Sequence, residues 1–270
     1  MTFKIKFKWV LINQTYLSSG ICDGTWRYQG GEEKLQTNVL DSVRSELAQI
    51  ADEKTRDSAQ RFFKEEAKFY GVKSAAVKKI AQKYHRAIKE REKPEIFALC
   101  ENLLQSGYGE EAAVAFEWAY SLRKAYQPQD FQVFESWVEK YADNWAKCDT
   151  LCNHTIGAFI EQYPSFINNL KIWATSENRW LRRASAVTLI VPAKTGDFLN
   201  EAMEISDILL KDKDDLVQKG YGWLLKEASR KHQKEVFEYV MAKKAEMPRT
   251  ALRYAIEKMP EEMRRKAMEK

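Results

Sequence analysis

Three stretches of the sequence decide the fold, because each begins a helix that directly follows another helical segment. Residues 144–159 read NWAKCDTLCNHTIGAF, residues 178–190 read NRWLRRASAVTLI, and residues 214–229 read DDLVQKGYGWLLKEAS. Their starts at Asn144, Asn178 and Asp214 are 34 and 36 residues apart. A period of this length is typical of two-helix solenoid repeats, in which each helical hairpin buries its apolar face against its neighbours.

The sequence outside these stretches also predicts helices. Glycine and proline are scarce, at 11 and 6 of 270 residues, whereas all-β proteins use many of both in turns. Ser74 is expected to cap a helix and Pro94 to open another. From about residue 35, apolar residues recur at the helical steps of three and four, as in Leu40, Val43, Leu47 and Ile50. We therefore predict an all-α, right-handed solenoid with a concave surface suited to a long ligand.

The N-terminal residues 1–34 differ from the rest. An alternating apolar pattern predicts a short strand at Phe3, Ile5, Phe7 and Trp9, and turn signals follow it. We interpret residues 1–34 as an N-terminal appendage, poorly ordered, and residues 35–270 as the repeat domain. The apolar run WVLI is too short for a signal peptide, and no stretch is long enough to span a membrane. We therefore expect a cytoplasmic protein.

The charge of the chain permits nucleic-acid binding without requiring it. The net charge is +5, from 44 basic and 39 acidic residues, and residues 51–100 alone hold 13 basic against 8 acidic ones. The basic helix in residues 73–93 presents Lys79, Lys83 and Arg86 on one face, which either contacts DNA or is a solvated outer face.

Several residues on the three helices could carry chemistry. Trp145 and Asp149 are four apart and share a helix face, Trp180 and Arg183 are three apart, and Trp223 lies on the third helix. An aromatic ring packs on a base, an arginine holds a phosphate, and a carboxylate stabilises a developing positive charge. Taken singly, each residue has a structural explanation. A tryptophan on a helical repeat usually packs in the core, an aspartate in the first turn offsets the helix dipole, and an arginine such as Arg183 can lie on a solvated face.

As a set, these residues resemble a known family. The order W-x-x-x-D, W-L-x-R and G-W-x-x-[RK] in three successive helices is similar to that of the AlkD-like DNA alkylation repair glycosylases, over roughly residues 40–258. The stretches RFFKEEAKFYGVKSAAVKKIA, GYGEEAAVAFEWA and RTALRYAIEK also match. The resemblance implies a right-handed superhelical solenoid of HEAT-like two-helix repeats. It also implies a DNA N-glycosylase for base excision repair, which hydrolyses the N-glycosidic bond of cationic N7- and N3-alkylpurines.

The resemblance further implies roles for single residues. Trp145 and Trp223 would be the aromatic walls of the cleft, Asp149 the catalytic carboxylate, and Arg183 a ligand of backbone phosphate. The DNA-binding residues expected on the same surface are Lys78, Lys79, Arg182, Lys219 and Lys226. The expected partner is double-stranded DNA with alkylated purines, bound by a monomer without a cofactor and without a tight base pocket.

Two other hypotheses stay open. The first is a non-catalytic helical-repeat module that binds nucleic acid or protein, because repeat folds commonly serve as scaffolds. The second is a cysteine-dependent enzyme that uses Cys148 or Cys152 with His154. The argument against it is that all three residues lie on one helix, without a further group to orient them. The same three residues lack a second ligand pair, so we expect no metal site.

Overall fold

The chain is a row of stacked helices. A computed structural model describes residues 30–64 and 66–269, with the side chains of the first helix from Val39 onward. Within these residues the elements are helices, and the only β-type pairing is an isolated bridge between Lys68 and Tyr108. The predicted all-α solenoid is confirmed. The first helix begins at Gly30, inside the segment interpreted as an appendage, and the predicted strand lies outside the described residues.

The helices are joined by short connections. Their bounds are α1 (Gly30–Gln49), α2 (Glu53–Gln60), α3 (Ser74–Ile88), α4 (Lys93–Gln105), α5 (Gly109–Ser121), η1 (Arg123–Ala125), α6 (Asp130–Tyr141), α7 (Trp145–Thr150), η2 (Leu151–Ile156), α8 (Gly157–Gln162), η3 (Pro164–Phe166), α9 (Ile167–Trp173), α10 (Arg179–Val187), α11 (Ile190–Thr195), α12 (Leu199–Ile208), α13 (Asp215–Ala228), α14 (Gln233–Lys243), α15 (Arg249–Ala255) and α16 (Glu261–Met268). Of these, η1 and η3 are 3₁₀ helices, and η2 is a π-helix that continues α7 into α8.

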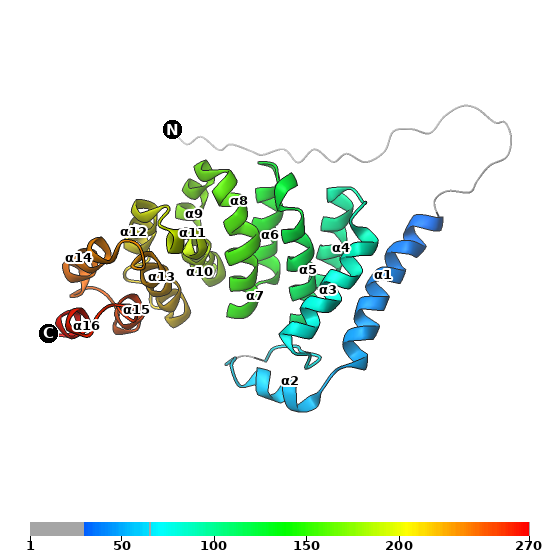
Figure 1. The fold of residues 1–270 in the computed structure, drawn as a ribbon, viewed down its shortest axis with the longest axis horizontal. Coiled ribbons are helices and arrows are strands. Elements are labelled where there is room, and N and C mark those ends of the chain that lie inside the picture. The colour runs from blue at the N-terminus through cyan, green and yellow to red at the C-terminus, as the bar shows by residue number, and fades with distance from the viewer. Residues whose placement is uncertain (1–29, 65, 270) are drawn as a thin grey trace, which may run out of the picture.

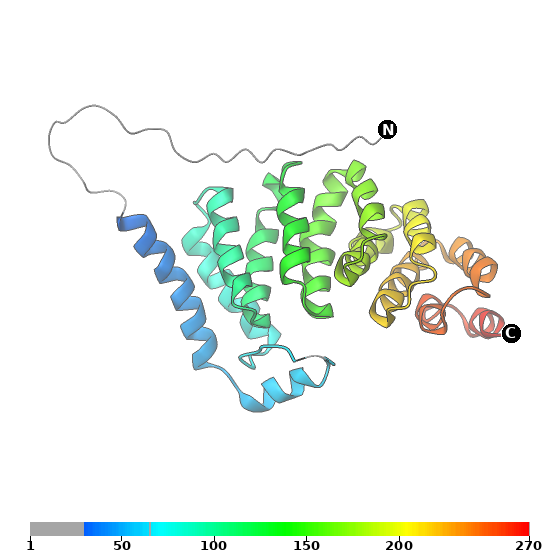
Figure 2. The same cartoon turned by 180° about the vertical axis from the view of Figure 1, so that it is seen from behind.

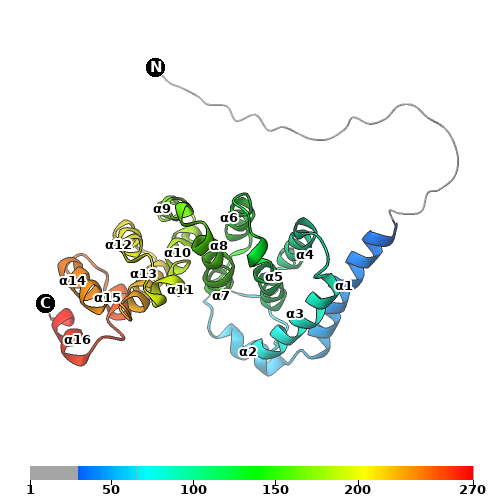
Figure 3. The ribbon, with the colours of Figure 1, turned by 45° about the horizontal axis from the view of Figure 1, so that its top comes forward.

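The helices form two rows that curve into an arc (Figures 1 and 2). In the first row, α3, α5, α7, α10, α13 and α15 pack on one another in chain order. We call this the inner row, because it lies on the hollow side of the arc in Figure 3, where α2 also lies. The second row contains α4, α6, α9, α12 and α14. The three stretches that decide the fold thus supply three consecutive helices of the inner row, α7, α10 and α13.

The capping residues explain where these three helices begin. Asn144, Asn178 and Asp214 are the N-caps, and each side chain accepts a backbone N–H bond of 2.9–3.1 Å from the first turn of its helix. The expectation for Ser74 is wrong. The cap position of α3 is Lys73, whose backbone is extended and whose side chain makes no capping bond, and Ser74 is already helical.

Aromatic side chains fill the space between the rows. Trp118, Trp137 and Trp173 are almost completely buried, and Trp118 Nε1 donates to the Ala81 carbonyl at 2.9 Å. These tryptophans are core residues, each with a large apolar surface removed from water.

The buried carboxylate of Glu110, in the first turn of α5, fixes the chain just before α3. Glu110 Oε1 accepts the N–H groups of Gly71 and Val72 at 2.9 and 3.0 Å, and Oε2 accepts that of Tyr70 at 3.1 Å. Gly71 has φ +93, and a Cβ there would lie 2.2 Å from the Asp52 carbonyl oxygen. Only glycine fits this close approach, so the base of the segment between α2 and α3 has a fixed shape.

We expect Glu110→Ala to lower the free energy of unfolding by about 3 kcal/mol or more, because it leaves three backbone N–H groups without an acceptor. Chemical denaturation checks this. The matched control is Glu117→Ala, two turns further along α5, whose carboxylate is partly exposed and 3.7 Å from Lys78; it should change stability by no more than about 0.5 kcal/mol. Equal effects of the two substitutions would contradict the prediction.

Candidate functional site

A buried ion pair joins three helices of the inner row. Arg183 of α10 donates from Nε to Asp149 Oδ1 at 2.8 Å and from Nη2 to Asp149 Oδ2 at 2.7 Å, which is a bidentate pair. The two residues are 5% and 8% exposed. Arg183 Nη1 also donates to the Leu216 carbonyl of α13. One guanidinium therefore connects α7, α10 and α13, and a Cβ at Gly220 would lie 3.5 Å from its side chain.

The charge state of Asp149 follows from two opposing effects. Burial raises the pKa of Asp149 above its ordinary value, and the hydrogen bonds and charge of Arg183 act against that rise. Arginine keeps its proton at any physiological pH, and both Asp149 oxygens accept an N–H from it, so the geometry of the pair is that of an ionised carboxylate. The site therefore holds a negative charge whose position is fixed by a bidentate partner.

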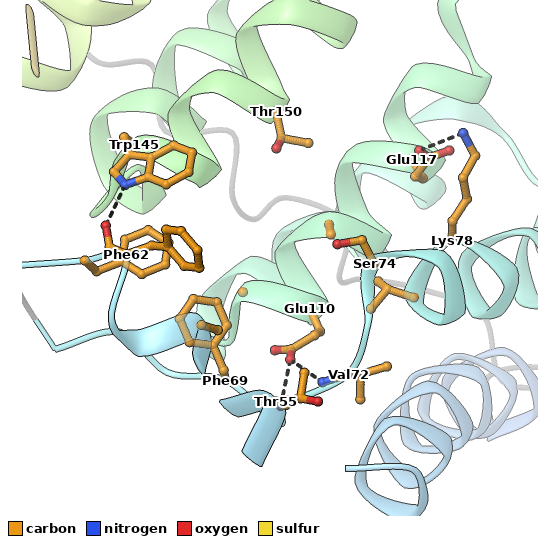
Figure 4. Close-up of a pocket in the computed structure, with 16 residues that line it drawn as sticks. Thr55, Phe62, Phe69, Val72, Ser74, Lys78, Glu110, Glu117, Trp145 and Thr150 are labelled. Atoms are coloured by element: carbon orange, nitrogen blue, oxygen red, sulfur yellow. Dashed lines mark hydrogen bonds and ion pairs between the residues drawn. The ribbon is translucent and has the colours of Figure 1, made fainter. Parts of the chain in front are cut away.

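Trp145 lies one helical turn before Asp149, at the N-terminus of α7, and is partly exposed. The ring of Phe63 stacks on its indole, with a centroid distance of 5.3 Å and an interplanar angle of 19°. Trp145 Nε1 donates to the Phe62 carbonyl at 3.3 Å. Both phenylalanines follow α2, so this segment reaches across the inner row to α7 (Figure 4).

An apolar cavity of about 470 Å³ lies beside Trp145. Figure 4 shows Trp145 and Phe69 on one side of it and Lys78 and Glu117 on the other. A smaller cavity of about 220 Å³ shares part of this lining and extends to His154. The lining of the larger one is Thr55, Ala59, Phe62, Phe63, Phe69, Gly71, Val72, Ser74, Val77, Lys78, Gly109, Glu110, Ala113, Glu117, Trp145 and Thr150. The predicted aromatic wall therefore borders a hollow between α3, α5 and α7.

Trp223 and two predicted DNA-binding lysines belong to α13. Trp223 is partly buried and packs against the core. Lys219 Nζ lies 3.0 Å from Asp215 Oδ2, and Lys226 Nζ lies 3.1 Å from Glu257 Oε2. The structure thus places both lysines in ion pairs. Trp223 is joined to the Asp149 region through α10, which packs on both α7 and α13.

The other predicted DNA-binding residues differ in exposure and in whether they are already paired with a carboxylate. Arg182 is held by Asp212 at 2.6 Å and by two carbonyls of the turn before α10. Lys78 and Lys79 on α3 are exposed, and the nearest carboxylate to Lys78 is Glu117 at 3.7 Å. Contact of these residues with DNA stays a prediction.

The basic face of α3 is in part an intramolecular surface. Lys83 Nζ lies 2.6 Å from Glu46 Oε2, which connects α3 to α1. Lys83 is therefore engaged within the protein, and the choice between a DNA contact and a solvated outer face for Lys79 and Arg86 stays a prediction.

The comparisons with known proteins fit this geometry. The family described as "DNA alkylation repair enzyme" matches residues 43–259. The chain belongs to this family. A solved structure of a "predicted DNA alkylation repair enzyme" from Enterococcus faecalis has a similar fold, with a TM-score of 0.70 at 16% identity; the match covers 78% of this chain and 97% of the other. A search of the curated proteins gives no match.

Membership gives this DNA alkylation repair protein a role in the repair of alkylated DNA. It adds no assignment of single residues, so the roles of Asp149, Trp145, Arg183 and Trp223 remain proposals. In the described part of the chain, no helix is long and apolar enough to cross a membrane, and no three histidine, cysteine or acidic side chains are grouped as metal ligands.

Sequence reasoning missed the ion pair between Asp149 and Arg183 and three further features of the repair protein's site. Phe63 covers Trp145, the Leu216 carbonyl accepts from Arg183, and Gly220 gives the guanidinium room. Only Phe63 had a signal in the sequence: the adjacent phenylalanines of RFFKEE directly follow a strongly polar stretch. A carbonyl contact and a close approach leave no such trace.

The structure does not favour a cysteine nucleophile in this repair protein. Cys148 and Cys152 are both fully buried. Burial raises the pKa of the Cys148 thiol well above its ordinary value, and the hydrogen bond to Cys152 raises it further. A thiol in such surroundings stays protonated and unreactive near neutral pH.

Arg183→Ala should lower the free energy of unfolding by about 3–5 kcal/mol, because it leaves the Asp149 carboxylate buried without a counter-charge. Thermal and chemical denaturation measure this. The double variant Asp149→Asn, Arg183→Leu should recover a large part of the loss, since neither charge is then buried. As a control, Arg86→Ala on the exposed face of α3 should change little. A single variant as stable as the parent would show that the ion pair is not needed for folding.

Proposed function

We propose that this protein is a DNA N-glycosylase that excises cationic N7- and N3-alkylpurines from double-stranded DNA in base excision repair. The observation that carries the proposal is the ionised, buried Asp149 held bidentately by Arg183 beside the partly exposed Trp145. This group of residues lies on the inner row of helices, in a chain that belongs to the DNA alkylation repair family. We expect the protein to act as a monomer in the cytoplasm and to need no cofactor.

The chemistry needs few groups. An alkylated purine already carries a positive charge, so it leaves as a neutral base without a general acid. As the bond to C1′ breaks, positive charge moves to the sugar, and the Asp149 carboxylate stabilises it. One such electrostatic partner contributes on the order of 3 kcal/mol to the barrier. The carboxylate orients the water whose oxygen adds to C1′, and the proton that this water loses passes to bulk solvent, so Asp149 ends the reaction ionised as it began.

Both oxygens of Asp149 accept from Arg183, yet each carboxylate oxygen has a second lone pair. These lone pairs remain for a water molecule or for the charge on the sugar. Arg183 uses one N–H on each of its three nitrogens inside the protein, so two of its five N–H groups remain. Its main role in this proposal is to position the carboxylate, because the Arg183 side chain is buried.

The aromatic residues and the cations supply binding. Trp145 and Trp223 would attract the cationic base through their π faces, with about 0.5–2 kcal/mol each. Lys78 and Lys79 are the exposed candidates for phosphate contacts. The remaining candidates, Arg182, Lys219 and Lys226, would contact DNA only by sharing or exchanging their present carboxylate partners.

The alternative is a non-catalytic helical-repeat module that binds nucleic acid or protein. One observation favours it: Asp149 is already engaged by Arg183, as a purely structural carboxylate would be. The two functions differ in whether the parent protein releases a free alkylpurine from DNA.

Asp149→Asn is expected to slow release of N7-methylguanine from duplex DNA by on the order of a hundredfold, because it removes the charge that stabilises the transition state. Single-turnover assays of released base measure the rate. Binding to the same DNA should be unchanged or tighter, since an anion is removed from a site for a polyanion.

The control for this experiment is Glu139→Gln, which neutralises an exposed carboxylate on α6 of the other row and should keep the parent rate. Because Asp149→Asn leaves Arg183 with a weaker partner, circular dichroism must show that this variant is folded at the assay temperature. A folded Asp149→Asn variant with the parent rate would contradict the mechanism. A parent that releases no alkylpurine would favour the scaffold.

DNA affinity should fall steeply with salt, because each neutralised phosphate releases counterions. Fluorescence anisotropy between about 50 and 200 mM salt gives the slope of log affinity against log salt. Lys78→Ala and Lys79→Ala should each reduce the size of that slope by about one. Lys234→Ala, an exposed lysine on α14 of the other row, should leave it unchanged. An affinity that does not respond to salt would argue against DNA contact through these lysines.

A further inference from the structure

The apolar cavity between α3, α5 and α7 lies next to the proposed catalytic carboxylate. Its volume is about 470 Å³, and its lining includes Trp145, one turn before Asp149, and Thr150, the residue directly after it. An apolar cavity of about 150 Å³ is large enough for a benzene molecule. The cavity beside Trp145 therefore has room for the two fused rings of a purine, and its size is that of an ordinary ligand pocket, roughly 300–1,000 Å³.

The walls of this cavity suit a flat ring system. Phe63, Phe69 and Trp145 contribute aromatic rings, and Val72 and Val77 contribute aliphatic side chains. Aromatic and apolar walls are what an extruded base needs, because it has lost its stacking neighbours in the duplex.

One wall of the cavity is held in a fixed shape. Glu110 accepts three consecutive backbone N–H groups just before α3. The Phe69 ring packs so closely on Gly109 that a Cβ there would overlap it. A pocket that is formed before its ligand arrives loses little free energy to reorganisation.

Glu117 is the one carboxylate in the lining that backbone N–H groups do not already hold. Its Oε1 lies 3.7 Å from Lys78 Nζ, and the two side chains are 38% and 61% exposed. Figure 4 shows both across the cavity from Trp145. An exposed pair at this distance is weak, so the Glu117 carboxylate can exchange Lys78 for another cation.

A carboxylate suits the pairing edge of guanine better than that of adenine. Guanine presents two adjacent donors, N1–H and N2–H, and the two oxygens of a carboxylate can accept both. Adenine presents one donor beside the lone pair of N1, which would face a carboxylate oxygen. Alkylation at N7 leaves both guanine donors in place and adds a positive charge. A cationic guanine can thus replace the charge of Lys78 beside Glu117, whereas a neutral base cannot.

We propose that this cavity is a pocket for the extruded lesion base, in which the Glu117 carboxylate accepts the N1–H and N2–H of an N7-alkylated guanine. This inference rests on the proposed function and narrows its preferred substrates to guanine lesions. It departs from the family resemblance, which implies recognition without a tight base pocket. Trp145 is an aromatic wall of the pocket, and Lys78, once released by Glu117, contacts a phosphate.

The test uses two variants of the pocket and one control. Glu117→Gln removes the negative charge and replaces one of the two acceptors by a donor. Ala113→Leu adds apolar bulk to the lining of the cavity. The control is Glu95→Gln, which neutralises an exposed carboxylate on α4 of the other row. Circular dichroism checks that each variant is folded.

The probes are two duplexes that differ at one position. One carries N7-methylguanine on a 2′-fluorinated sugar, whose glycosidic bond resists hydrolysis, and the other carries unmodified guanine. The buffer is mildly acidic, because methylation at N7 makes N1–H more acidic and Glu117 needs that proton in place. Anisotropy titration gives the ratio of the two affinities for each protein.

The parent protein should bind the cationic duplex more tightly than the unmodified one. Glu117→Gln and Ala113→Leu should each lower this preference roughly tenfold, the factor that corresponds to one charge-assisted hydrogen bond. Glu95→Gln should retain the parent ratio. In single-turnover assays, Glu117→Gln should also lower the rate of N7-methylguanine release relative to N3-methyladenine release, because a glutamine amide complements the adenine edge.

The inference requires a fall in both pocket variants. A parent without a preference, or an affinity ratio that falls in only one of the two variants, would overturn it. Because the titrations require no bond cleavage, they separate the two proposals. A protein that shows both falls and releases no base keeps the pocket and loses the glycosylase function. A protein whose two variants release N7-methylguanine at the parent rate keeps that function and loses the pocket.

Discussion

The ion pair between Asp149 and Arg183 is the interaction on which the candidate site depends. It joins α7 to α10 directly and reaches α13 through the Leu216 carbonyl, so three successive inner helices share one guanidinium. Burying two charges carries a desolvation cost that their attraction only partly repays, and apolar residues could hold such helices as well. The stacked repeats already have an aromatic core. The ion pair provides a carboxylate in a fixed position, which apolar packing cannot provide.

The sequence predicted those features that are local. Asn144, Asn178 and Asp214 begin helices because a capping side chain acts within one turn of itself. Ser74 shows the limit of the same rule, since the backbone at Lys73 leaves the helix one residue earlier than the residue type suggests. The repeat period places α7 and α10 next to each other, but the sequence analysis expects Arg183 to bind backbone phosphate and does not predict its pairing with Asp149.

What the sequence could not give depends on contacts across the fold. The Phe62 carbonyl and the Trp145 indole are 83 residues apart along the chain. Whether a lysine is free for DNA also depends on distant partners: Lys226 meets Glu257, whereas Lys79 remains exposed. Residue type and spacing are the same for a free and for a paired lysine. The roles of the cations were therefore the least predictable part of the site.

In the proposed function, the pairing also resolves a conflict between DNA binding and catalysis. A lone carboxylate in a groove for DNA would repel the phosphates over several ångströms. With Arg183 against it, the pair is neutral as a unit, and at the distance of the backbone phosphates its field largely cancels. At C1′, which the proposed mechanism places in contact with the carboxylate oxygens, the cancellation would be incomplete and the negative charge would act on the sugar. The charge is therefore placed before the substrate arrives and needs no reorganisation during the reaction.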